Sequence, residues 1–149
     1  MKKHVKLLVL IIWMAVIFAM SAEAAPESEE TSNFVTEIIY RIYAFFSSNP
    51  INGSLFIERY AGIIRKLAHF TEFMILGFLS VSNAREYFAK NYELYGACFG
   101  ILYAISDEIH QLFVENRCCS IKDVLIDSVG IMCGIFLYRL ISKKWKKDY

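Results

Sequence analysis

Four long apolar windows dominate the hydropathy pattern of the chain. They run over residues 5–21, 63–82, 94–114 and 121–141. A helix that crosses a bilayer needs about 20 mostly apolar residues, and each window comes close to that length. The pattern therefore predicts an all-α membrane protein, with four transmembrane helices in one bundle and residues 1–149 forming a single domain.

The region 22–62, between the first two windows, is more polar. We expect "PESEETSN" (26–33) to form an acidic, exposed linker. The next segment, "FVTEIIYRIYAFF" (34–46), has helical periodicity, with Glu37 and Arg41 four residues apart on its polar side. We predict that this amphipathic helix lies flat on the outer surface of the membrane.

The N-terminal segment supports two interpretations. "MKKHVK", an apolar run and "SAEAA" are typical of a cleavable signal peptide. The same run is also long enough to be retained as a membrane anchor. Either interpretation places residue 26 and the region after it outside the cytoplasm.

Lysine and arginine determine the predicted orientation, because basic loops stay in the cytoplasm. If the chain has four spans, both termini and the loop after the second window lie on one side. The basic residues on that side are Lys2, Lys3, Lys6, Arg85, Lys90, Lys143, Lys144, Lys146 and Lys147. We therefore predict that both termini are cytoplasmic.

Composition narrows the range of possible functions further. The chain has 16 basic and 15 acidic residues, and a net charge of +1 predicts no attraction to nucleic acid. The four cysteines have neither CxxC nor zinc-site spacing, so no metal or other cofactor is predicted. We expect Cys98 and Cys133 to be core residues and all four thiols to be free.

Polar residues interrupt three of the windows at a similar depth. Glu72 lies nine residues after the start of its window, which corresponds to a depth on the order of 10 Å. Asp107 and Glu108 lie at about the same depth in the third window, and Asp127 follows Asp123 by one turn in the fourth. The full set is Lys66, His69, Glu72, Asp107, Glu108, Gln111, Arg117, Asp123 and Asp127.

Charged groups persist inside a bilayer only when they face the bundle interior, pair or take up protons. The cytoplasmic halves of the same windows have almost no ionisable residues. We therefore predict a polar pocket that opens outward and not a pore. The alternative that involves no ligand is a buried ion-pair network that only fixes helix packing. Asp123, three residues after Ser120, also fits a helix cap, and Arg117 also fits an ordinary loop charge.

Two GxxxG pairs occur in the last two windows. Gly96 and Gly100 form one pair, and Gly130 and Gly134 form the other. Small residues at this spacing allow helices to approach closely, so we expect these four glycines at helix contacts.

Three segments give the chain a family resemblance: "KLAHFTEF" (66–73), "DEIHQLFVENR" (107–117) and "SIKDVLIDSVGIMCG" (120–134). In order and spacing they resemble the VanZ-like family of small bacterial membrane proteins. The end of the first window, "WMAVIFAMS" (13–21), also fits the family and favours a retained first helix. Family motif residues correspond here to Lys66, His69, Glu72, Asp107, Glu108, Gln111, Arg117, Ser120, Asp123, Asp127 and Gly130.

Two positions depart from the family pattern. Glu115–Asn116 stands where relatives often have Pro-Gly, and Phe73 stands where Tyr is frequent. The resemblance implies a polytopic membrane protein of the cell envelope, with some relatives linked to resistance to teicoplanin-like glycopeptides.

The leading functional hypothesis is a pocket that binds a lipid headgroup, a cell-wall precursor or a glycopeptide antibiotic. Membrane lipids are the other expected partners. The alternative is an intramembrane enzyme for a lipid-linked substrate, in which His69 acts as a base beside Glu72 or the polar set holds a metal. A proton-coupled transporter needs polar residues through the full depth of the membrane. The apolar cytoplasmic half argues against a transporter.

Overall fold

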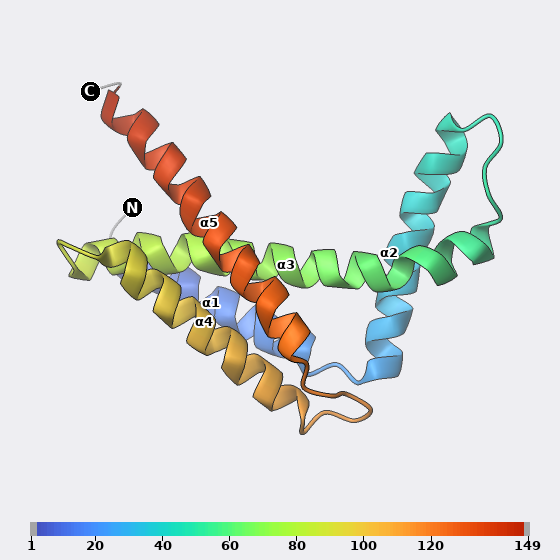
Figure 1. Cartoon of the computed structure of the whole chain (residues 1–149), viewed down its shortest axis with the longest axis horizontal. Helices are drawn as coiled ribbons and strands as arrows, with labels where there is room; N and C mark the ends of the chain where they lie inside the picture. Colours follow the sequence, from blue (N-terminus) through green and yellow to red (C-terminus); the bar gives the residue numbers. More distant parts are fainter. Residues whose placement is uncertain (1–2, 148–149) are drawn as a thin grey trace.

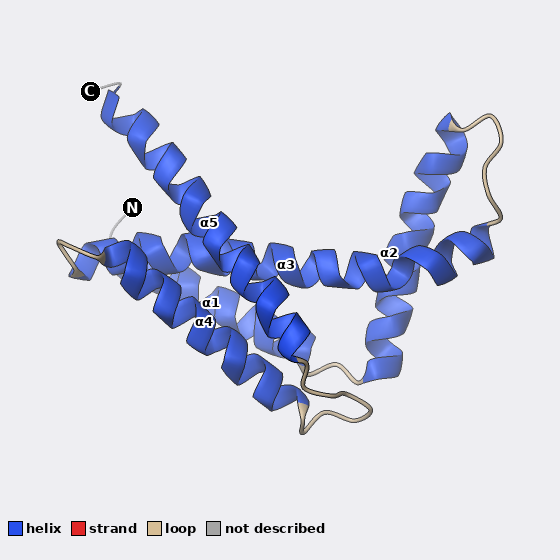
Figure 2. Ribbon diagram, in the orientation of Figure 1, coloured by secondary structure: helices blue, strands red, loops and turns tan. Residues whose placement is uncertain are grey.

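The computed structural model describes the backbone of residues 3–147 and the side chains of residues 3–142. Within that range the chain forms five α-helices and no strand, which confirms the all-α prediction (Figure 2). The predicted cytoplasmic lysines at positions 2, 143, 144, 146 and 147 lie outside the described side chains.

The helices are α1 (Lys3–Ser21), α2 (Ala25–Phe46), α3 (Gly53–Tyr87), α4 (Tyr92–Gln111) and α5 (Ile121–Lys147). Figure 1 shows α3 along the length of the molecule, with α5 crossing it and with α1 and α4 on one side. The start of α1, the α3–α4 connection and the end of α5 lie at one end of the bundle. The α1–α2 and α4–α5 connections lie together away from that end.

Two predicted boundaries in the region 22–62 are wrong. Residues 26–33 are not a linker but the first turns of α2, because Pro26 is well suited to a first helical turn. Residues 53–62 belong to α3, which starts ten residues before the predicted window. Asn52 caps this start, since its side chain accepts a hydrogen bond of 2.9 Å from the Ser54 amide.

The other windows differ from the helices at their ends. α4 ends at Gln111 and not at 114, because residues 112–116 form turns. α5 continues to Lys147, six residues beyond the predicted window. Helix ends without strong capping signals are hard to place from hydropathy alone.

The first half of helix α2 packs through small polar residues, while Tyr40 and Tyr43 near its end contact Phe56 of α3. Ser28, Ser32 and Thr36 are buried, and two of their hydroxyls donate to the carbonyl four residues earlier. The apolar side faces outward, with Phe34 63% exposed and Phe45 83% exposed. An exposed apolar face of this kind is typical of a helix in contact with lipid.

The core lies where α3 meets α1, α4 and α5. Its buried apolar residues are Leu10, Ile17, Phe73, Leu76, Val81, Ala104, Ile131 and Ile135. Glycines let the helices approach closely there: a Cβ on Gly134 would lie 2.8 Å from the Phe78 nitrogen, and one on Gly96 would lie 2.8 Å from Val81 Cα. Gly130 faces the Phe70 carbonyl and Gly100 faces the Ile131 side chain, so all four predicted glycines lie at helix crossings.

Helix α1 is bonded to the bundle along its length. Trp13 Nε1 donates to the Glu72 carbonyl at 3.0 Å, and the Tyr103 hydroxyl donates to the Met14 carbonyl at 2.7 Å. Gln111 Nε2 lies 3.1 Å from Ser21 Oγ at the far end of α1.

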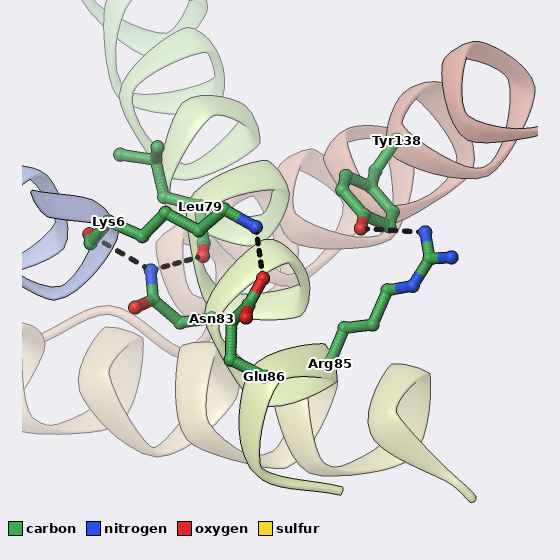
Figure 3. A network of polar contacts seen from close by, with 6 residues as sticks. All are labelled: Lys6, Leu79, Asn83, Arg85, Glu86 and Tyr138. Atoms are coloured by element: carbon green, nitrogen blue, oxygen red, sulfur yellow. Dashed lines mark hydrogen bonds and ion pairs between the residues drawn. The ribbon is translucent and has the colours of Figure 1, made fainter. Parts of the chain in front are cut away.

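Polar contacts also tie the start of α1 and the middle of α5 to the end of α3 (Figure 3). Asn83 Nδ2 donates to the Lys6 carbonyl at 3.1 Å, while the Lys6 ammonium pairs with Glu86. On the other side, Arg85 donates to the Tyr138 hydroxyl at 3.2 Å.

Two of the helices are long and apolar enough to cross a membrane, over Lys3–Ser21 and Ile121–Ser142. Most of their apolar side chains are exposed, including Leu8, Ile12, Phe136 and Leu140.

Cys98 and Cys133 are exposed as well, so the prediction that they are core residues is wrong: they lie on the outward sides of their helices. All four thiols are free, as predicted.

Candidate functional site

A cavity of about 320 Å³ lies beside the α4–α5 loop, where α3, α4 and α5 converge with the first residue of α2. Its lining includes seven of the nine predicted pocket residues: Lys66, His69, Glu108, Gln111, Arg117, Asp123 and Asp127. The remaining lining residues are Ala25, Gly62, Arg65, Asn116, Cys118 and Ile126. Helical periodicity explains the α3 contribution, because residues at spacings of three and four share one side of a helix.

The cationic part of the lining consists of two arginines and a lysine. Arg65 Nε donates to Ser32 Oγ at 3.1 Å, and Arg117 Nε donates to the Glu23 carbonyl at 3.3 Å. Burial of the Arg117 guanidinium, followed by the positive charge of Arg65, lowers the pKa of Arg117 from its ordinary value. The two guanidinium groups are thus near enough to repel one another.

The acidic part of the lining uses its carboxylates in different ways. Asp123 Oδ1 lies 4.0 Å from Lys66 Nζ, and both side chains are well exposed. Glu108 Oε2 accepts a hydrogen bond of 2.8 Å from the Ser120 amide. Asp127 is only 1% exposed, and neither of its oxygens has a hydrogen-bond partner in the described part of the chain.

Burying a polar group without a partner is costly, by about 2–7 kcal/mol depending on the reference state. Asp127 therefore needs a hydrogen-bond donor or a proton. Its side chain is part of the cavity lining, so a molecule bound there would lie next to the buried carboxyl group.

Two predicted residues lie behind the cavity and not on it. Glu72 Oε2 is 3.7 Å from His69 Nδ1, and Glu72 lines a second cavity of about 140 Å³ between α2 and α3. Asp107 is 3% exposed, with no hydrogen-bond partner for its carboxyl oxygens among the described residues. Both nevertheless lie within Coulombic range of Asp127.

His110 points to α1, as its register on α4 suggests. Its ring centroid is 4.3 Å from that of Phe18, and it is not part of the cavity lining. This position fits a packing role for His110 and not a role in the cavity.

The α4–α5 loop contains the position at which the sequence departs from Pro-Gly. Asn116 has a φ of 57°, in the left-handed region that glycine adopts most readily and asparagine tolerates better than most residues. Asn116 can therefore take the conformation that a glycine would take there. The departure leaves the loop able to place Arg117 at the cavity.

Arg65 is the functional candidate that the sequence analysis missed. It stands four residues before His69 and seven before Glu72, so helical periodicity already placed it on their side of α3. Asn116 and Cys118 also line the cavity, but only the path of the loop brings them there.

The arrangement is suited to binding through charge and hydrogen bonds. Arginine and lysine can hold phosphate or carboxylate groups, while the carboxylates can accept from hydroxyl or amide groups. Among the described residues, no group of three or more His, Cys, Asp and Glu side chains is placed to hold one metal ion.

Comparison with protein families gives one match, to VanZ/LLP1, over residues 6–142. Neither curated proteins nor solved structures match the chain. The matched range contains all five helices except the first residues of α1 and the last turn of α5, and it includes the whole cavity lining. The chain therefore belongs to the VanZ/LLP1 family.

Proposed function

We propose that this protein is a cell-membrane protein with four transmembrane helices, formed by α1, α4, α5 and most of α3. Family membership and two strongly apolar helices already indicate a membrane protein. α3 and α4 are less apolar because they carry polar residues of the site, of which Asp107, Glu108 and Gln111 of α4 are buried in the bundle.

The proposed orientation has both termini in the cytoplasm and the cavity open to the outside, with α1 retained. Lys6 and Arg85 lie at the end of the bundle opposite the cavity, which agrees with a cytoplasmic location of basic residues. The exposed apolar face of α2 supports contact of this helix with the outer surface of the membrane.

Within this topology, we propose that the cavity binds a lipid headgroup, a cell-wall precursor or a glycopeptide-type antibiotic. Such binding would contribute to envelope function or antibiotic resistance. One observation carries the proposal: α3, α5 and the α4–α5 loop place two arginines and the buried, unpartnered Asp127 around one cavity. A network that only fixed packing would be expected to pair these groups with one another.

The alternative of an intramembrane enzyme has less support. His69 is 3.7 Å from Glu72, beyond hydrogen-bond distance, and the described residues offer no three-residue metal cluster. A binding role needs only the charges and hydrogen-bonding groups that already line the cavity.

The test is protection of a teicoplanin-sensitive bacterial host that expresses the chain. Asp127→Asn and Arg117→Gln should reduce protection to the level of the empty vector, with membrane levels of the protein unchanged. Glu58→Gln and Arg59→Gln are matched controls, because both residues are exposed and neither lines the cavity. Full protection by both cavity variants, or no protection by the wild-type chain, would contradict the proposal of resistance through this cavity.

A further inference from the structure

We propose that the ligand is an anionic lipid with a hydroxylated phosphate headgroup. Its phosphate would lie at Arg65 and Arg117. Its acyl chain would extend out of the cavity between α1, α2 and α3. This inference rests on the proposed function, because it uses the same cavity, and it adds the chemical class of the ligand and its path.

The two arginines are available to an anion. Neither has a carboxylate oxygen within 4.0 Å in the part of the chain that the structure describes. Each uses its Nε for a neutral oxygen of the protein, and no hydrogen bond of the terminal guanidinium nitrogens is found within the same range. Glu23, Glu108 and Asp107 act on Arg117 only from a greater distance. Two guanidinium groups that line one cavity, with no carboxylate in direct contact, can hold a phosphate, since each can donate two parallel hydrogen bonds.

The buried Asp127 carboxyl group in the cavity lining would be satisfied by hydrogen-bond donors on the ligand. Asp127 is buried at 1% exposure and has no donor among the described residues. Hydroxyl groups next to the phosphate, as in a glycerol or sugar headgroup, would supply that donor. A headgroup that lacks hydroxyls or amines would leave the carboxyl group unpartnered.

A second cavity extends from the first between α2 and α3. The two cavities share Arg65 and His69 in their linings, so these two side chains stand between them. The second cavity has a volume of about 140 Å³, and its lining includes the apolar side chains of Met20, Val35 and Ile64. The lining therefore changes from charged to partly apolar along this direction.

A third, wider groove continues from the second along the outside of α3. It shares Ile64, Ala68 and Glu72 with the second cavity and has a volume of about 430 Å³. Its other lining residues are Trp13, Ile39, Leu67, Thr71 and Ile75. The apolar groove lies on the outward side of the bundle, where Leu67 is 57% exposed.

The three spaces together match an amphiphile and not a free anion. A cavity lined by both basic and acidic side chains, a narrow mixed passage and an open apolar groove follow one another through shared lining residues. A free phosphate would use only the first of them. An acyl chain in the groove would cover apolar side chains and remain continuous with the surrounding lipid.

Trp13 provides a direct test, because it lines the groove and the chain has only two tryptophans. In full-length protein carrying Trp145→Phe, Trp13 is the only tryptophan. The protein is reconstituted in phosphatidylcholine bilayers with a small fraction of phosphatidylglycerol, and either lipid carries a brominated acyl chain that quenches tryptophan. The readout is the ratio of Trp13 quenching by brominated phosphatidylglycerol to that by brominated phosphatidylcholine, at equal mole fraction.

We expect a strong preference for phosphatidylglycerol, which falls on the order of 10-fold in Arg65→Gln/Arg117→Gln, as charge-assisted contacts to two guanidinium groups are lost. Arg59→Gln removes an exposed arginine of the same helix outside the cavity and should keep the preference. Glycerophosphoglycerol, the headgroup without chains, should compete only weakly.

Equal quenching by the two lipids in the wild-type background would overturn the inference. Competition by inorganic phosphate at the same concentration as by phosphatidylglycerol would overturn it too, and would indicate a free-anion site. If lipid preference is absent while Asp127→Asn still abolishes antibiotic protection, this inference fails and the proposed function stands. If the preference is present and the variants keep full protection, the proposed resistance role fails and the lipid site stands.

Discussion

The Ser120 amide donates a hydrogen bond of 2.8 Å to Oε2 of Glu108. This bond joins the start of α5 to the last turn of α4 across the loop that carries Arg117. Glu108 is 2% exposed, so the bond is partly buried and helps to determine where the loop lies against the cavity.

Replacing Glu108 should loosen this loop. A hydrogen bond to a charged group contributes about 1.5–3 kcal/mol, so Glu108→Ala should speed amide exchange over residues 112–120 by on the order of 10-fold or more. Glu108→Gln keeps an acceptor oxygen and should have a smaller effect. Hydrogen–deuterium exchange of the purified protein measures both, and unchanged exchange in Glu108→Ala would show that the bond does not hold the loop.

Gly134→Ala should destabilise the crossing of α3 and α5. The new Cβ would meet the backbone of Met74 and Phe78, which cannot move away without separating the helices. We expect a loss of about 1–3 kcal/mol in the free energy of unfolding, as is usual for overpacking. Unfolding in mixed detergent micelles measures it.

Gly62→Ala is the matched control for Gly134→Ala. A Cβ at Gly62 meets nothing within 4 Å, and Gly62 also lies inside a helix. This substitution should raise stability by about 0.5–1 kcal/mol because alanine loses less backbone entropy than glycine. Equal destabilisation by both substitutions would contradict the close packing at Gly134.

The sequence predicted the helical content and most of the cavity because both depend on local periodicity. Lys66 and His69 share one side of α3 through their spacing of three, and both line the cavity. Arg65 follows the same rule and could have been included. Asn116 and Cys118 could not, because their position depends on how the loop turns.

Residues 26–33 show where composition misleads. Acidic and small polar residues are common in linkers, yet here Ser28 and Ser32 form the packing side of α2. The Ser32 hydroxyl donates to the Ser28 carbonyl and accepts from Arg65, so its burial leaves it satisfied. A serine side of a helix cannot be told from an exposed linker until the neighbouring helix is known.

The first helix should remain in the mature protein. Leu10 and Ile17 belong to the core, and Tyr103 donates to the Met14 carbonyl at 2.7 Å. Removal of α1 would expose these groups, so we expect the intact mass of the purified protein to include residues 3–21. A mass that corresponds to a chain starting at Ala25 or Pro26 would show that the segment is cleaved.

The Lys6–Glu86 pair, at the end of the bundle away from the cavity, should make the stability of the fold depend on pH (Figure 3). The hydrogen bond and charge of Lys6 lower the pKa of Glu86 below its ordinary value of 4.5. A carboxyl group with a lowered pKa in the folded state stabilises the fold above its ordinary pKa, and this contribution is lost as the pH falls through the folded value.

Glu86→Gln should therefore lower Tm relative to the wild type at about pH 7, and this difference should shrink as the pH falls below the ordinary pKa of Glu86. The effect should be small because Glu86 is exposed, and it should shrink further at high salt. Thermal unfolding of the two proteins across this pH range measures it. A Tm difference that grows as the pH falls would contradict the ion pair.

The polar residues of α3, α4 and α5 line one cavity, and we propose that this cavity opens outside the cell. Cys118 lines this cavity and is exposed, so it can report its side of the membrane once Cys98, Cys119 and Cys133 are replaced by serine. A membrane-impermeant maleimide should label Cys118 in intact cells. It should label a cysteine placed at Lys90, in the α3–α4 connection, only after permeabilisation. The reverse pattern, with Lys90→Cys labelled in intact cells and Cys118 protected, would contradict the account.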